Sequence, residues 1–341
     1  MLRKVYPFIP CVIESKLMFK IPTILSAEEL IDKAFRKASK INIPPAKSKL
    51  EMIRQKNLAK IGSVSDSISS ALESYVKAFP DLENLPPFYR DLIDLLLDID
   101  QLKKSLGAID WCSYQVQRIS RAARANVKRS RSLSGMDEIR EGAYGRCASL
   151  VRQVGKDLEF LGRARDQVKM LPNIDPRMRT IVVAGAPNVG KSLLVAGLST
   201  AKPKVASYPF TTKEITVGIV EFGRRRYQMI DTPGLLDRPI EEKNDIELQA
   251  IIALRSLADL VLFILDPTGT CGYPIEYQES LLRGIRKLYP DINTMTIENK
   301  ADVLRRDNEN LKISALTKDG LDELKRRIEQ ELPSETESKS F

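Results

Sequence analysis

The sequence predicts an α/β domain, with a mostly parallel sheet flanked by helices, preceded by an all-α helical bundle domain. After residue 179, short apolar runs alternate with helical patterns, which is typical of an α/β domain. Before residue 170, apolar residues recur at three- and four-residue spacing, which is typical of packed helices. Residues 171–176, LPNIDP, separate the helical pattern from the alternating one. We therefore expect a helical domain over 1–175, an α/β domain over 176–332 and a polar tail over 333–341.

The helical half is divided by caps and prolines. Ser26, followed three residues later by Glu29, predicts a helix start with a capping box, and Pro44-Pro45 ends that helix. Pro86-Pro87 marks a second break. Further helices are predicted at 46–59, 64–79, 88–106, 110–132 and 136–169.

The strands of the second half are predicted from its short apolar runs. Each run is followed by a loop or by a helical pattern, as expected when parallel strands alternate with helices. The predicted strands are 180–184, 216–222, 227–230, 260–265, 293–297 and 311–313.

Composition excludes several classes of chemistry. The chain has no histidine, which excludes Ser-His-Asp and Cys-His catalysis and histidine-ligated metals. Its four cysteines form no CxxC pair, so we expect no disulfide or thiolate zinc site and a cytoplasmic location. We see no signal-peptide pattern and no apolar run of membrane-spanning length, and we expect no membrane partner.

The net positive charge is confined to the first half. The net charge is +9, and residues 1–175 carry 30 Lys and Arg against 21 Asp and Glu, whereas residues 176–341 carry 24 against 24. A local surplus of this kind indicates a polyanionic partner.

A phosphate-binding loop follows the first predicted strand. Residues 185–192, GAPNVGKS, match the pattern GxxxxGK[ST] between a strand and a helix. Backbone amides of such a loop surround phosphate, Lys191 reaches the β- and γ-phosphates, and the Ser192 hydroxyl binds Mg²⁺. The candidate phosphate-site residues are Gly185, Ala186, Pro187, Asn188, Val189, Gly190, Lys191, Ser192 and the adjoining Leu193.

Two later motifs select a guanine nucleotide. Asp231 opens the DxxG sequence at a strand end, where its carboxylate can hold Mg²⁺ and the Gly234 amide can reach the γ-phosphate. Asn299-Lys300-Ala301-Asp302 matches NKxD: the Asp302 carboxylate can accept hydrogen bonds from N1–H and N2–H₂ of guanine, a donor pair that adenine lacks. Lys300 should pack over the base. Further candidate base contacts are Ser314, Ala315, whose amide could reach guanine O6, and Leu316. The second half is therefore predicted to be a P-loop GTPase domain that binds GTP and GDP.

Hydrolysis is predicted to be slow. The position after DxxG, where a glutamine orients the attacking water in Ras-like enzymes, is Leu235. Thr212, with Thr211 as the alternative, should complete the Mg²⁺ shell and sense the γ-phosphate. Asn188 could help to bind K⁺ near the transferring phosphate, or could only shape the loop. The candidate catalytic residues are Lys191, Thr212, Gly234 and Asn188.

A basic stripe is predicted on the helix over 110–132. Its members are Arg118, Arg121, Arg124, Lys128 and Arg131, at spacings of 3, 3, 4 and 3, and no Asp or Glu occurs from 111 to 136. A solvated charged face normally mixes both signs, so we interpret the stripe as a candidate rRNA contact.

The sequence resembles the Nog family of nucleolar GTP-binding proteins, within the Obg-related GTPases. The resemblance covers nearly the whole chain. It rests on the nucleotide motifs and on seven further stretches: LPNIDP at 171–176, SYPFTTK at 207–213, IDTPGLLDRP at 230–239, NDIELQAIIA at 244–253, CGY at 271–273, FYRDLI at 88–93 and YGRC at 144–147. The chain looks like the short archaeal form. The resemblance implies a nucleotide-switched assembly factor for the large ribosomal subunit, with switches at 203–213 and 231–245.

Two functions stay open at this point. Family membership implies binding to large-subunit rRNA and pre-ribosomal particles, and we expect no DNA partner. The alternative is an Obg-type regulatory GTPase that senses the ratio of GTP to GDP and binds a protein target.

Overall fold

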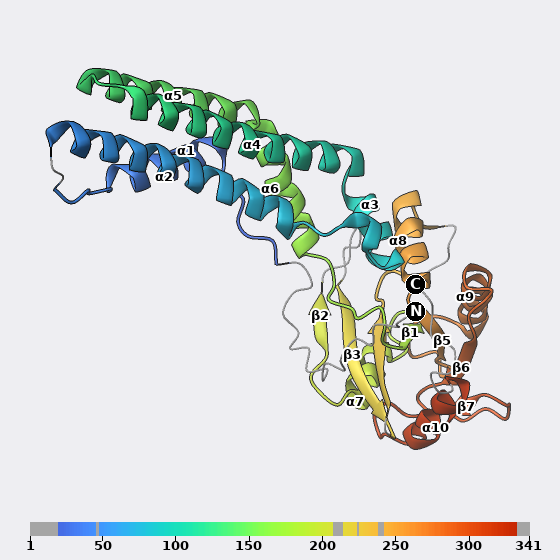
Figure 1. The fold of residues 1–341 in the computed structure, drawn as a ribbon. Coiled ribbons are helices and arrows are strands. Elements are labelled where there is room, and N and C mark those ends of the chain that lie inside the picture. The colour runs from blue at the N-terminus through green and yellow to red at the C-terminus, as the bar shows by residue number, and fades with distance from the viewer. Residues whose placement is uncertain (1–19, 46–47, 207–213, 224, 238–241, 333–341) are drawn as a thin grey trace, which may run out of the picture.

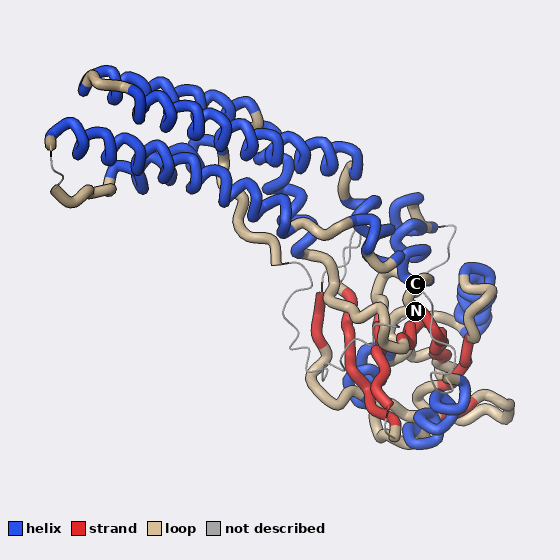
Figure 2. The backbone as a smooth tube through the Cα atoms, viewed as in Figure 1, coloured by secondary structure: helices blue, strands red, loops and turns tan. Residues whose placement is uncertain are grey.

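The computed structural model describes residues 20–45, 48–206, 214–223, 225–237 and 242–332. Its first part is an elongated bundle of helices that projects from a second part built on a sheet (Figure 1). All the strands within these residues lie in the second part (Figure 2). The fold class predicted from sequence, a helical bundle before an α/β domain, is confirmed.

Six α-helices build the first part. Helix α1 begins with the predicted capping box: the Glu29 amide donates to Ser26 Oγ over 3.3 Å, and the Ser26 amide donates to Glu29 Oε2 over 2.8 Å. The helices are α1 (Ala27–Ser39), α2 (Lys49–Ala78), α3 (Pro87–Leu96), α4 (Ile99–Arg129), α5 (Leu133–Gln153) and α6 (Gly155–Lys169), with a short 3₁₀ turn, η1 (Leu82–Asn84).

Three helix boundaries predicted from sequence are wrong. The segments 46–59 and 64–79 form one helix, α2, which passes through Gly62. Gly62 is buried, and a Cβ there would stand 4.0 Å from Arg124 Nη1, so packing against α4 outweighs the low helix propensity of glycine. The boundary expected at 107–109 lies at Asp98, whose carboxylate caps α4 by accepting the Gln101 amide over 2.9 Å. The segment 136–169 is broken at Val154 into α5 and α6.

The bundle has two apolar cores. Helices α1, α2, α4 and α5 pack together along their length. Near the tip that is distant from the sheet, a small separate cluster joins α2, α4 and α5: Ile61, Ala123, Val127, Met136 and Ala143. The other buried residues of the bundle belong to one cluster that continues into the second part, so the two parts share a core.

The second part is a seven-stranded sheet in the order β2-β3-β4-β1-β5-β6-β7. Strands β4, β1, β5, β6 and β7 are parallel, and the hairpin β3–β4 and edge strand β2 are antiparallel, so the predicted mostly parallel sheet is confirmed. The strands are β1 (Thr180–Ala184), β2 (Lys204–Ala206), β3 (Ile215–Phe222), β4 (Arg225–Asp231), β5 (Ala258–Leu265), β6 (Thr294–Glu298) and β7 (Leu311–Lys312). Strand β2 was not predicted from the sequence, because its three residues are too few to show an apolar run.

Four helices accompany the strands: α7 (Lys191–Leu198), α8 (Asp245–Arg255), α9 (Ile275–Leu288) and α10 (Leu321–Glu331). Because β1, β4, β5 and β6 are parallel, their carboxyl ends meet at one edge of the sheet, the usual place for a ligand in this architecture. The candidate nucleotide motifs all follow these strand ends.

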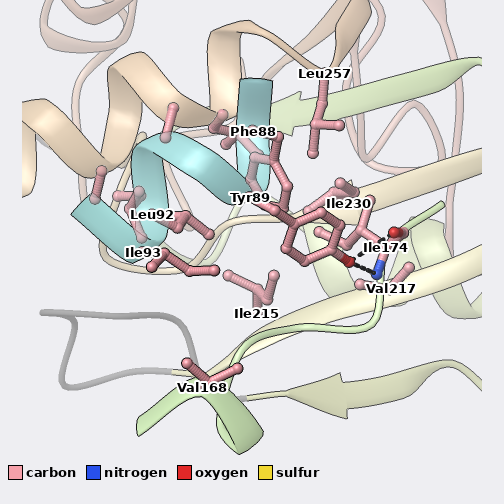
Figure 3. Close-up of a cluster of buried hydrophobic side chains, with 14 of the residues drawn as sticks. Phe88, Tyr89, Leu92, Ile93, Val168, Ile174, Ile215, Val217, Ile230 and Leu257 are labelled. Atoms are coloured by element: carbon pink, nitrogen blue, oxygen red, sulfur yellow. Dashed lines mark hydrogen bonds between the residues drawn. The ribbon is translucent and has the colours of Figure 1, made fainter. Parts of the chain in front are cut away.

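Helix α3 joins the two parts. Its buried Phe88, Tyr89, Leu92 and Ile93 lie over the sheet, next to Ile215 and Val217 of β3 and Ile230 of β4 (Figure 3). Helix α3 also packs against α8. The strands under α3 therefore lead directly to the nucleotide motifs: β3 begins just after residues 207–213, and β4 ends at Asp231.

Candidate nucleotide site and basic helix

The loop between β1 and α7 requires glycine at two positions. Gly185 has φ 142°, and a Cβ there would lie 2.5 Å from the Ile264 carbonyl oxygen. Gly190 has φ 100°, and a Cβ there would lie 2.3 Å from Asn299 Nδ2. Only glycine fits these left-handed, crowded positions. The strand–loop–helix context that the motif needs is therefore present, with α7 beginning at Lys191.

Lys191 is buried inside this loop. Its ammonium donates to the carbonyl oxygens of Gly185 over 2.9 Å and Ala186 over 2.8 Å. The ammonium is thus held by two backbone carbonyls of the loop whose amides are expected to surround the phosphates of a nucleotide.

Ser192 and Asp231 meet at the carboxyl ends of β1 and β4. The Ser192 hydroxyl donates to Asp231 Oδ2, and the other carboxylate oxygen, Oδ1, is buried with no hydrogen-bond partner in the described structure. Burial raises the pKa of Asp231, which is fully buried. An unpartnered buried oxygen beside a hydroxyl is a donor set that suits Mg²⁺, so the two residues predicted as metal ligands fit that ion. Thr212 and its alternative Thr211 lie outside the described residues.

Gly234 is held by two side chains that follow it. Its amide donates to Asp237 Oδ2 over 2.8 Å, and its carbonyl accepts from Lys243 Nζ over 3.4 Å. Leu235 is buried in the core, so it is a packing residue and cannot orient water. Sequence analysis did not identify Asp237, because a single acid after DxxG carries no recognisable spacing.

Asn299 connects the two sides of the site. Its Nδ2 donates to the Val189 carbonyl over 2.8 Å, and its Oδ1 accepts the Ala315 amide over 2.9 Å. Asn299 therefore joins the P-loop, the NKxD motif and the loop after β7. Because the Ala315 amide is engaged by Asn299, its assignment to guanine O6 stays a proposal. Ser314 is buried, and its hydroxyl accepts the Thr317 amide.

Lys300 is anchored by a residue that sequence analysis missed. Its ammonium donates to Asp266 Oδ2 over 2.6 Å and to Thr270 Oγ1 over 2.7 Å. Burial alone would raise the pKa of Asp266, but hydrogen bonds from Lys300 and Thr268 outweigh it and lower that pKa. Asp302, by contrast, is exposed. For Asp266, the only signal in the sequence was its place at the start of the DPTG turn, directly after β5.

The basic residues of the predicted stripe lie exposed on α4, with one exception. Arg118, Arg121, Arg124 and Lys128 are exposed on the helix, but α4 ends at Arg129, so Arg131 lies in the following loop. The prediction that all five share one helix is wrong at that residue, because the Ser130 amide makes the last helical bond, to Asn126. Within the described ranges, none of the five takes part in an ion pair.

No helix in the part of the chain that the structure describes is long and apolar enough to cross a membrane.

Two family models match the chain. The NOG1 N-terminal helical domain matches residues 19–175, and the 50S ribosome-binding GTPase matches residues 180–302. An uncharacterized protein of Methanocaldococcus jannaschii is 38% identical over 84% of this chain and 81% of its own length. Nucleolar GTP-binding protein 1 of Saccharomyces cerevisiae is 35% identical over 84% of this chain, but the match spans only 44% of that longer protein.

A solved structure also matches. It is that of the putative nucleolar GTP-binding protein 1 of Plasmodium falciparum, which is 34% identical, covers 48% of this chain and 89% of that one, and has a TM-score of 0.42.

Proposed function

Because the chain belongs to the family of nucleolar GTP-binding protein 1, we propose that it is a nucleotide-switched assembly factor for the large ribosomal subunit. Its C-terminal half is a GTPase domain. The proposal has this domain bind GTP and hydrolyse it slowly to GDP and phosphate, while the helical domain over 1–175 contacts large-subunit rRNA in pre-ribosomal particles. The observation that carries the rRNA contact is the exposed row of cations on α4, which has no acidic partner among the described residues.

The residues divide into three groups in this proposal. The P-loop, from Gly185 to Ser192 with Leu193 beyond it, surrounds the phosphates, and Lys191 neutralises their charge. Asp302 accepts the guanine edge, while Asn299 and Lys300 hold the base pocket in shape. The Gly234 amide turns from Asp237 to the γ-phosphate when GTP binds, which makes the segment after Asp231 sensitive to the nucleotide.

Mg²⁺ fits the site formed by Ser192 and Asp231, with Thr212, or Thr211, as the third proposed ligand. When bound there, the ion would supply positive charge that offsets the charge of the nucleotide phosphates. The Asn188 side chain is exposed on the loop and could contribute an oxygen to K⁺, although its φ of 61° also suits a residue that shapes the turn. Both roles of Asn188 stay open.

Slow hydrolysis follows from Leu235. The described structure has a buried leucine where water would be oriented, so no side chain at that position can activate the nucleophile. Rapid turnover would need a group supplied from elsewhere, such as a partner.

Packing supports a route from the nucleotide to the bundle. Helix α8 follows the segment after Asp231, and α3 packs on both α8 and β3. A change in the switch segments would move the surface on which α3 rests, and α3 leads into α4 through a two-residue connection. We propose that the orientation of the bundle thereby depends on the bound nucleotide.

Co-sedimentation with large-subunit particles tests the function. Wild-type protein should co-sediment with the particles and should dissociate steeply as salt rises, because each phosphate contact releases counterions. Changing Arg121, Arg124 and Lys128 together to Glu should weaken binding by at least about tenfold and leave GDP affinity nearly unchanged.

A matched control is available on another helix of the same bundle. Lys33, Lys37 and Lys40 are exposed on or directly after α1 and form no ion pair in the described residues, so changing them to Glu makes the same charge change elsewhere. If that variant loses particles as strongly as the α4 variant, the α4 contact is wrong. If wild-type protein binds no particles, and instead captures a protein target in the GTP state, the regulatory alternative replaces the assembly role.

A further inference from the structure

Two large aromatic side chains are exposed side by side on α4. Trp111 is 43% exposed and Tyr114 is 57% exposed, and no other aromatic residue is among the strongly exposed apolar side chains of the described structure. Neither side chain makes a hydrogen bond or a ring contact within the described residues. Trp111 is also the only tryptophan of the chain. Isolated exposed apolar residues are ordinary, but an exposed aromatic pair on one helix face needs an explanation.

Helix geometry places this pair in line with cations. At 3.6 residues per turn, Trp111 lies two turns before Arg118, and Tyr114 lies about one turn before it. Arg121 and Arg129 fall on the same side of the helix, because they follow Arg118 by three and eleven residues. We call Trp111, Tyr114, Arg118, Arg121 and Arg129 the aromatic-basic face.

The small residues of this face leave its cations accessible. Ala122 and Ala125 lie between the arginines and are exposed, and no acidic residue occurs from 111 to 136. The whole face extends over about 27 Å of helix, with two ring surfaces at one end and a row of guanidinium groups over the remaining part, about 17 Å from Arg118 to Arg129.

We propose that Trp111 and Tyr114 stack on unpaired bases of an RNA strand whose phosphates run along the arginines of the aromatic-basic face. The inference rests on the proposed rRNA contact and adds the kind of RNA that is recognised. Phosphates are bound by arginine in any nucleic acid, but an aromatic ring can stack only on a base that is free of its helix. A double helix could bind the arginines through its phosphates, but its paired bases would offer no free surface on which Trp111 and Tyr114 could stack. A lipid surface would need an apolar face broader than two side chains, and this face continues as Arg and Ala.

The single tryptophan gives a direct test. In full-length protein with GDP, emission from Trp111 reports this site alone, because no second tryptophan contributes. An unstructured twelve-nucleotide RNA should bind and quench the tryptophan emission. A duplex RNA of equal length, and heparin as a polyanion without bases, should bind at low salt without comparable quenching. Equal quenching by heparin or duplex RNA would overturn the stacking role.

Substitutions separate stacking from charge. Trp111→Ala and Tyr114→Ala should each weaken binding of the unstructured RNA by about tenfold and should leave heparin binding unchanged, whereas Trp111→Phe should retain most of the affinity. Met170→Ala is the matched control, because Met170 is an exposed apolar residue, 67% accessible, at the end of α6. Circular dichroism should show that all four variants keep the helical fold.

The outcomes distinguish this inference from the proposed function. If the aromatic variants bind RNA like wild type while the variant of Arg121, Arg124 and Lys128 does not, the stacking platform is wrong and the rRNA contact stands. If quenching is produced by an acidic peptide such as polyglutamate and not by RNA, the face binds protein and the inference fails. If no nucleic acid binds to any variant or to wild type, both proposals fail together.

Discussion

The Tyr89 hydroxyl is bonded to both backbone groups of Ile174. It accepts a hydrogen bond from the Ile174 amide over 2.9 Å, and its oxygen lies 2.7 Å from the Ile174 carbonyl oxygen, to which it can donate (Figure 3). Tyr89 belongs to α3, and Ile174 belongs to the connection between α6 and β1. Both residues are buried, and burial raises the pKa of Tyr89 to about 12. One side chain thus fixes the helical part to the entry of the GTPase domain.

Removing this hydroxyl should destabilise the protein. Tyr89→Phe keeps the ring but leaves the Ile174 amide buried without that partner, which should cost about 1–3 kcal/mol of unfolding free energy. Urea denaturation followed by circular dichroism measures the change. Tyr114→Phe is the control, since it removes a hydroxyl from an exposed tyrosine and should alter the unfolding free energy by less than about 0.5 kcal/mol. Equal effects of the two substitutions would show that the bond to Ile174 contributes little.

Replacing Asp302 should change which base is bound. Asn at this position can donate as well as accept, so it suits xanthine, which carries an oxygen where guanine carries N2–H₂. We expect Asp302→Asn to weaken GDP binding by about 100-fold or more and to favour xanthosine diphosphate. Competition against a fluorescent nucleotide measures both. If the variant still prefers GDP, or if wild-type protein binds ATP as well as GTP, the role of residues 299–302 in base selection is wrong.

Sequence was sufficient wherever a short motif fixes its own surroundings. GAPNVGKS needs a strand before it and a helix after it, and both are present, while Ser26 and Glu29 form a cap within one turn. The errors have a different origin. The continuity of α2 through Gly62 depends on packing against α4, and the break at Asp98 depends on a cap that competes with a strong helical pattern on either side. The contact with α4 is distant along the chain, whereas the cap at Asp98 is local, and the helical periodicity on both sides of it hid its signal.

The same distinction applies to the site. Ser192 and Asp231 were predicted together because the spacing of GTPase motifs is fixed. Asp266 was missed because its partner, Lys300, lies 34 residues away along the chain. Asp237 lies only three residues after its partner, Gly234, but a single acid after DxxG carries no recognisable spacing.

Truncating Lys191 should abolish tight nucleotide binding while the fold survives. Its ammonium is the buried cation of the P-loop, so Lys191→Ala removes charge from the point where phosphate is expected. We expect GDP affinity to fall by about 100-fold or more. Isothermal titration calorimetry gives the affinity, and circular dichroism checks the fold. Normal GTP hydrolysis by this variant would contradict the P-loop assignment.

Monovalent cations decide between the two roles of Asn188. If its side chain helps to hold K⁺, GTP turnover should be faster in K⁺ than in Na⁺ at equal ionic strength, and Asn188→Ala should remove the difference. Phosphate release measures turnover. Equal rates in both salts would leave Asn188 as a residue that only shapes the loop.

The bond between Asp266 and Lys300 should set the affinity for the base. Asp266 is fully buried, and it also accepts hydrogen bonds from the Thr268 and Cys271 amides, so it is fixed before a nucleotide arrives. Lys300 has φ 63°, an uncommon conformation for a residue with a side chain, and its anchored ammonium extends the stem that we propose to lie over guanine. Asp266→Asn should weaken GDP binding by about tenfold, because the neutral amide holds the ammonium less tightly.

Glu298 provides the matched control for Asp266. It is an equally buried carboxylate at the end of β6, but it binds Arg306, Asn308 and Asn310 and is not bonded to Lys300. Glu298→Gln and Asp266→Asn should both lower the unfolding free energy, but Glu298→Gln should change GDP affinity less. A cycle that combines Asp266→Asn with Lys300→Met should show non-additive losses of GDP affinity, since both changes break one interaction. Additive losses, or an equal effect of Glu298→Gln, would mean that Asp266 stabilises the loop without positioning Lys300.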